Sequence, residues 1–91
     1  SIDSHYTITT ADYYIGCNHT ASVTLTLPSA ASLASGQTFT IKDESGQADS
    51  YNITVVRQGG DLIDGQINFN IESPYGAVNL YSNGNNKFFL F

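Results

Sequence analysis

The stretch Val23-Thr-Leu-Thr-Leu27 alternates apolar and hydroxyl-bearing residues without interruption, and Pro28 follows it directly. A period of two places successive side chains on opposite faces of a β-strand, so the Val and Leu residues face a core and the two Thr residues face outward. Pro28 cannot donate a ladder hydrogen bond and therefore ends the strand. The stretch predicts a half-buried strand whose outer face is uncharged but rich in hydrogen-bonding groups.

The same alternation recurs along the chain, with Thr, Asn and Gln on the outward side in place of Lys and Glu. Strands are expected at Tyr6–Thr9, Tyr13–Gly16, Ser22–Leu27, Phe39–Asp43, Tyr51–Arg57, Gln66–Ile71, Ala77–Tyr81 and Lys87–Phe91. Their inward residues are expected to form the core: Val23, Leu25, Leu27, Phe39, Ile41, Ile53, Val55, Ile67, Phe69 and Ile71. Short strands separated by turns predict an all-β fold, a small antiparallel sandwich or barrel-like domain of about seven or eight strands.

The connections carry their own signals. The Ala-rich segment Ser29–Ser35, followed by Gly36, predicts a single helical turn or a compact loop. Phe39–Asp43 and Tyr51–Arg57 are predicted to pair as a hairpin. Asp64-Gly65 predicts a tight turn, and Ser82–Asn86 predicts a final hairpin.

Composition limits the classes of function. The 91 residues are expected to form one domain, residues 1–91, and the absence of Met predicts a C-terminal fragment of a longer protein. Charged residues are only 12% of the chain, about half the usual share, which favours an oligomer. A net charge of −5 with three basic residues argues against nucleic acid and anionic membranes as partners. No apolar run approaches the roughly 18 residues of a membrane helix, so membrane insertion is not expected.

No pattern of residues indicates catalysis, a cofactor or a metal. The acidic residues lack the spacing of a calcium-binding loop and are read as turn formers through Asx-type hydrogen bonds. Cys17 has His19 two residues away but no third group to orient a base, so it is read as a packed or semi-exposed thiol. An enzyme is therefore not predicted.

Tyrosines are the best candidates for recognition, because a Tyr ring stacks on apolar surfaces and its hydroxyl forms hydrogen bonds. The predicted binding residues are Tyr14, Asn18, His19, Tyr51 and Tyr75, on or beside predicted turns. For any single Tyr, packing in the core or at a subunit interface is an alternative.

The last strand differs from the others, because Phe88-Phe-Leu-Phe91 is apolar on both faces. A strand with this pattern is usually covered on both sides. Phe88, Phe89 and Phe91 are accordingly predicted to take part in contacts between subunits.

Taken together, several segments resemble a module of bacteriophage tail fibres and other viral fibre or spike proteins. The resemblance runs through Tyr6–Thr9, Asp12–Gly16, Val23–Pro28, Gly36–Asp43, Gly46–Ala48, Asn52–Thr54, Ile63–Gly65 and Leu80–Gly84, and ends in the aromatic last strand. It covers nearly the whole chain in order. It implies a virion part on the outside of the particle, commonly a homotrimer at the distal head or tip of a fibre, that binds a host cell-surface glycan or protein receptor or trimerises the fibre.

Two other functions stay open at this point. One is a monomeric carbohydrate-binding module of a larger enzyme, which the loop tyrosines and the Asn, Thr and Gln faces favour. The other is a purely structural domain that caps the fibre while another part meets the receptor.

Overall fold

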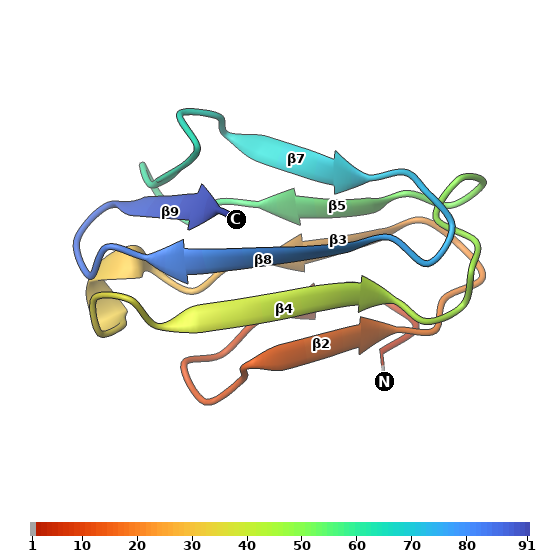
Figure 1. Ribbon diagram of the computed structural model, residues 1–91, viewed down its shortest axis with the longest axis horizontal. Helices are drawn as coiled ribbons and strands as arrows, with labels where there is room; N and C mark the ends of the chain where they lie inside the picture. Colours follow the sequence, from red (N-terminus) through yellow and green to blue (C-terminus); the bar gives the residue numbers. More distant parts are fainter. Residues whose placement is uncertain (1) are drawn as a thin grey trace.

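Two β-sheets lie face to face in the structure, a computed structural model that describes residues 2–91 (Figure 1). The strands are β1 (Tyr6–Thr7), β2 (Tyr14–Cys17), β3 (Val23–Thr26), β4 (Thr38–Asp43), β5 (Ile53–Val56), β6 (Leu62–Ile63), β7 (Asn68–Ile71), β8 (Ala77–Ser82) and β9 (Lys87–Leu90). The four-stranded sheet has the order β1-β3-β5-β7, and the five-stranded sheet has the order β2-β4-β8-β9-β6. The predicted all-β fold is thus confirmed.

The sheets are mixed, so the prediction of an antiparallel fold is wrong. From β1 to β8 every connection crosses from one sheet to the other. A chain that runs out along one sheet and back along the other returns to the first in its original direction. The pairs β1–β3, β2–β4 and β3–β5 are therefore parallel. For the same reason β4 and β5 lie in different sheets and do not form the predicted hairpin.

Antiparallel pairing appears where a tight turn reverses the chain. Asp64 and Gly65 both have positive φ, 49° and 79°, and Ile63 and Gln66 exchange two backbone hydrogen bonds of 2.8 Å around them. This two-residue hairpin turn confirms the turn predicted at Asp64-Gly65 and sends β7 back antiparallel to β5. The predicted final hairpin is also confirmed, as β8 and β9 pair antiparallel.

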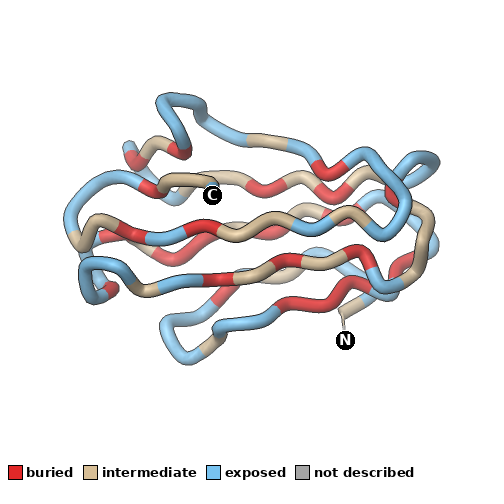
Figure 2. The backbone as a smooth tube through the Cα atoms, viewed as in Figure 1, coloured by how far each residue is buried: buried red, intermediate tan, exposed pale blue. Residues whose placement is uncertain are grey.

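The core lies between the sheets, where inward residues alternate with outward ones along most strands (Figure 2). Of the predicted core residues, Val23, Leu25, Leu27, Phe39, Ile41, Ile53, Val55 and Ile71 are buried. Phe69 is partly buried against this cluster. Ile67 is 56% exposed, so its predicted burial is wrong. It lies before β7 starts at Asn68, outside the alternating register that holds Ile71 inward.

One end of the sandwich is closed by a buried polar clamp. The predicted helical turn is a 3₁₀ turn at Ala30–Ser32, called η1. The buried backbone N–H of Ala30 donates to Asp61 Oδ2 at 2.8 Å, and Ser82 Oγ donates to the Ala30 carbonyl at 3.1 Å. Both backbone groups of one residue are satisfied by side chains from other parts of the chain, which fixes η1 beneath β8.

Ile71 is buried and Ile67, four residues earlier, is exposed, so the two residues give a matched test of the core. Ile71→Ala should lower the free energy of unfolding by about 2–4 kcal/mol, since a buried Ile is replaced by a cavity. Ile67→Ala should change it by less than about 0.5 kcal/mol, because that side chain is already in water. Urea unfolding of both variants measures the difference. Equal losses would show that Ile67 is packed and that the register of β7 is wrong.

Candidate functional site

Three loops meet at the end of the sandwich opposite η1, seen at the right of Figure 1. They are residues 18–22 between β2 and β3, residues 44–52 between β4 and β5, and residues 72–76 between β7 and β8. All five predicted binding residues lie on these loops or on β2 beside them. The sandwich therefore gathers at one end groups that are up to about sixty residues apart in the chain, and this loop end is the candidate site.

The loop end is organised by Asp43, the last residue of β4, whose side chain is completely buried. Its Oδ1 accepts hydrogen bonds from Ser45 N at 3.1 Å, Ser45 Oγ at 2.7 Å and Gly46 N at 3.1 Å. Its Oδ2 accepts from Ala48 N and Tyr75 N, both at 3.0 Å. One carboxylate thus receives five hydrogen bonds and ties two loops to the end of β4. The expected Asx-type role of the acidic residues is confirmed for Asp43.

The third loop joins the same cluster through His19. His19 Nε2 donates to the carbonyl oxygen of Tyr51 at 2.7 Å, and its Nδ1 lies 3.8 Å from Asp43 Oδ1. Both side chains are fully buried. The prediction of His19 as a ligand contact is therefore corrected: its ring lies inside the protein, where it links the first loop to the second.

Ser45, His19 and Asp43 are the residue types of a nucleophilic triad, but their hydrogen bonds are arranged differently. In a triad the Ser hydroxyl donates to an imidazole that the carboxylate holds from its other nitrogen. Here Ser45 Oγ donates to Asp43 at 2.7 Å and lies 3.4 Å from His19 Nδ1, while His19 Nε2 donates to a backbone carbonyl. The cluster satisfies buried polar groups and fixes the loops.

The charge on Asp43 is stabilised by its donors. Burial alone would raise the pKa of Asp43, but hydrogen bonds from Ser45 and from the backbone of Tyr75, Ala48 and Gly46 outweigh burial, so the pKa is lowered. The carboxylate is therefore ionised throughout the neutral range, and its lone pairs are directed at donors of the protein itself.

Two of the predicted binding tyrosines lie on the outer side of this cluster. Tyr14 is 48% exposed and its hydroxyl donates to Glu44 Oε2 at 3.1 Å. Tyr75 is 59% exposed, and its ring lies so close over Gly46 that a Cβ there would approach it to 2.5 Å. Lys42 Nζ donates to the Tyr75 carbonyl and lies 5.9 Å from the centre of its ring. Exposed rings, a carboxylate and an ammonium group thus share one surface.

The remaining predicted residues border this surface. Asn18 is exposed, and its backbone N–H donates to the carbonyl of Ile2 at 2.8 Å. Tyr51 is 37% exposed and opens the segment that enters β5. Four of the five predicted binding side chains therefore reach solvent at the same end.

Cys17 lies beside the cluster and is completely buried. Burial raises the pKa of its thiol to about 11, and the neighbouring carboxylates of Asp43 and Glu44 act in the same direction. A thiol with this pKa is almost entirely protonated at neutral pH, so it packs as a small apolar group. Of the two states expected from the sequence, packed or semi-exposed, the structure shows the packed one.

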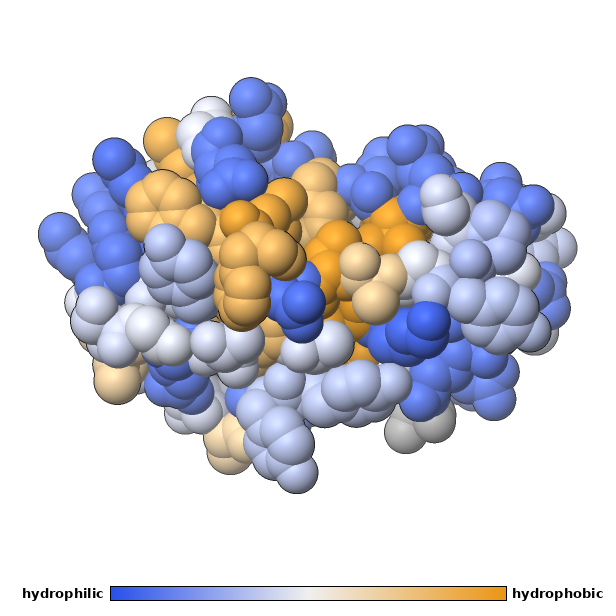
Figure 3. Space-filling view, viewed as in Figure 1, coloured by the Kyte–Doolittle hydropathy of each residue, from blue (hydrophilic) through white to orange (hydrophobic). Residues whose placement is uncertain are grey.

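A second surface feature lies on the outer face of the five-stranded sheet, toward its other end. The ring of Tyr81 is 5.4 Å from that of Phe89 and 5.7 Å from that of Phe91, measured between centroids. Phe91 is 67% exposed and Tyr81 is 36% exposed. Figure 3 shows apolar side chains gathered over β8 and β9 with hydrophilic ones on either side. We call these three residues the aromatic patch.

Phe88 is not part of the aromatic patch. It pairs with Ser82 on the inner face of the sheet and is fully buried in the core of its own chain. Its prediction as a subunit contact is corrected on this ground. Strand alternation places Phe89 and Phe91 outward, on the opposite face from Phe88.

Among residues 2–91 no three His, Cys, Asp or Glu side chains gather in a way that could hold a metal ion. Within the same residues, no helix has the length and apolar character needed to cross a membrane. No protein-family model matches the chain, and no curated protein is similar to it in sequence.

Substitution of Asp43 tests the buried cluster. Asp43→Asn should lower the free energy of unfolding at pH 7 by about 2–3 kcal/mol, because an amide NH₂ would face buried N–H groups that need an acceptor. Urea unfolding measures this, with Asp49→Asn as the control, since Asp49 is exposed.

The stability difference between wild type and Asp43→Asn should depend on pH. The pKa of Asp43 is lower in the folded protein than the value of about 3.9 for an unfolded chain. Its contribution to stability is therefore complete above that value and is lost as the pH falls through the folded pKa. The difference between wild type and Asp43→Asn should shrink below about pH 4. A difference that is constant from neutral to acid pH would contradict the role of the charge.

Labelling of Cys17 with a thiol reagent such as Ellman's reagent tests its burial and pKa. Native protein at neutral pH should react very slowly, and protein unfolded in urea should react at once. Fast reaction of the folded protein would show that the interior beside Cys17 opens readily.

Proposed function

We propose that the chain is a non-catalytic contact module of a viral or phage fibre or spike, on the outside of the virion. In this proposal it assembles as a homotrimer through the aromatic patch and meets a host cell-surface molecule with the loop end. The observation that carries the proposal is the aromatic patch, in which Tyr81 and Phe91 are solvent-exposed and Phe89 is half-buried in the single chain.

Exposed rings in contact with one another favour a protein interface. Aromatic side chains are enriched in the centres of interfaces, where they bury large areas with little loss of side-chain freedom. Two neighbouring outward residues are uncharged: Thr38 lies opposite Tyr81, and the Phe91 backbone N–H donates to the Asn79 carbonyl at 2.9 Å. The charged neighbour on this face is the exposed Lys87, two residues before Phe89 on β9. In copies of the chain that meet through the three rings, Lys87 is placed at the border of the contact, where its ammonium group can remain in water.

The loop end supports the attachment part of the proposal. Its loops are anchored by the Asp43 cluster, so exposed groups such as Tyr14 and Tyr75 are presented in a fixed arrangement. Rigid aromatic side chains beside a carboxylate and an ammonium group suit contact with a polar partner. Three copies on one fibre would add weak contacts into useful avidity.

The molar mass of the protein in solution tests the assembly. Light scattering after size exclusion, over a dilution series, should give the mass of about three chains for wild type. Phe91→Asp and Phe89→Asp should shift this to one chain, because burying an unpaired carboxylate in an apolar contact is costly. Circular dichroism should be unchanged, since both rings lie outside the core.

Tyr13→Asp is the matched control for these variants. Tyr13 is 77% exposed and lies away from the aromatic patch, so its replacement should leave the mass unaltered. A wild-type protein that is monomeric at every concentration would overturn the assembly proposal. A trimer that tolerates Asp at both Phe positions would place the interface elsewhere.

A further inference from the structure

The outer face of the four-stranded sheet carries an ordered array of uncharged polar groups. In-register pairing places Thr7, Thr26, Val56 and Asn68 in one row across the sheet. A second row, from β3 to β7, contains Thr24, Thr54 and Asn70. We call these seven residues the hydroxyl face. Neighbouring strands lie about 4.8 Å apart, so the polar groups recur at that interval across the face.

The polar side chains of the hydroxyl face have no partners within the described chain. The hydroxyls of its four Thr residues and the amides of its two Asn residues form no hydrogen bond with any of residues 2–91. The opposite sheet differs: Thr40 Oγ1 donates to Asn79 Oδ1 at 2.8 Å, and Thr38 Oγ1 donates to the Gly36 carbonyl. The hydroxyl face therefore keeps its hydrogen-bonding capacity for something outside the chain.

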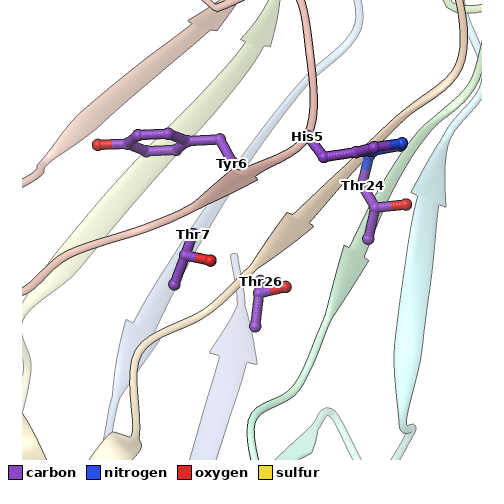
Figure 4. Close-up of a pocket in the computed structure, with 5 residues that line it drawn as sticks. All are labelled: His5, Tyr6, Thr7, Thr24 and Thr26. Atoms are coloured by element: carbon purple, nitrogen blue, oxygen red, sulfur yellow. The ribbon is translucent and has the colours of Figure 1, made fainter.

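The hydroxyl face is hollowed where β1 and β3 lie side by side. A shallow, open cavity of about 310 Å³ is lined by His5, Tyr6, Thr7, Thr24 and Thr26 (Figure 4). This volume is at the lower end of the range for small-ligand sites. Figure 4 shows Tyr6 turned away from His5 and Thr24, and its hydroxyl donates to Asp12 at 2.7 Å. The hydrogen-bonding groups left for a ligand in this cavity are those of the three Thr residues and His5.

His5 is held in one orientation by the backbone. Thr24 N donates to His5 Nδ1 at 2.8 Å, so in the neutral imidazole the hydrogen is on Nε2. The cavity thus offers one fixed N–H donor beside hydroxyls that both donate and accept.

We propose that this cavity, with the adjoining hydroxyl face, is a binding site for a neutral saccharide. Sugar hydroxyls donate and accept in the same way as Thr hydroxyls, and the Thr methyl groups with Val56 provide apolar contact for the C–H groups of a ring. With His5 neutral, no lining residue is charged, so the site has no partner for a carboxylate or sulfate group. The inference deepens the attachment part of the proposed function, on which it rests for its biological setting, and places a second contact on the outer face of the four-stranded sheet.

Nuclear magnetic resonance titration tests the site. The probes are soluble neutral oligosaccharides of glucose, mannose, galactose and N-acetylglucosamine, with heparin as the charged comparison. At least one neutral oligosaccharide should cause saturable shifts in the amide signals of residues 5–7, 24–26 and 54, and heparin should not compete. No saturable shift with any of these sugars, shifts confined to other residues, or competition by heparin would overturn the inference.

Matched variants separate binding from folding. Thr24→Val with Thr26→Val removes two hydroxyls while keeping shape and strand propensity, and should weaken binding about tenfold. Thr38→Val, an exposed strand position on the other sheet, should leave affinity unchanged. Equal affinity of wild type and the double variant would overturn the inference.

Failure of the saccharide site can be distinguished from failure of the assembly proposal, because the two are tested by different variants and measurements. The double variant should keep the molar mass of wild type, and Phe91→Asp should keep the affinity per chain for the oligosaccharide. If the double variant instead changed the molar mass, the hydroxyl face would be an interface between copies, and the saccharide site would be rejected.

Discussion

The buried carboxylate of Asp43 is the interaction on which the arrangement of the loop end depends. It receives five hydrogen bonds from two loops, and His19 brings a third loop against it. A charge in a protein interior is tolerated only when such donors replace water. Because four of the five donors are backbone N–H groups, the same contacts that satisfy the charge also fix the path of the chain.

With the loops fixed at one end and η1 clamped at the other, the two sheets present outer faces of different chemistry. The five-stranded sheet carries the aromatic patch, and the four-stranded sheet carries the hydroxyl face. An assembly through the first leaves the second open to solvent and to ligands. In the proposed assembly and saccharide site, the low content of charged residues has a separate consequence on each face: weak repulsion between copies on one, and preference for neutral ligands on the other.

Much of the fold follows from local pattern. The period of two identified most strands and the inner residues such as Leu25 and Ile53, since alternation reflects burial on one side. Pairing direction was not predictable, because it depends on which sheet the next strand joins. The same period also places Asp43 inward after Phe39 and Ile41, so parity could have identified it as a buried acid, although the acidic residues were predicted only as turn formers. The partners of Asp43 from other loops, and the burial of His19, arise only from tertiary contact.

The repeated passage of the chain between the two sheets has a consequence for how the protein folds. Among the strands of residues 2–91, only β8 and β9 are neighbours both in sequence and in a sheet; β4, for example, pairs with β8 across more than thirty residues. Chains dominated by such distant contacts fold slowly, because the entropy of closing long loops is lost before the contacts form. Until β8 is in place, β4 has an unpaired edge. The nascent or unfolding chain therefore exposes hydrogen-bonding strand edges for long periods, during which pairing with other copies competes with folding.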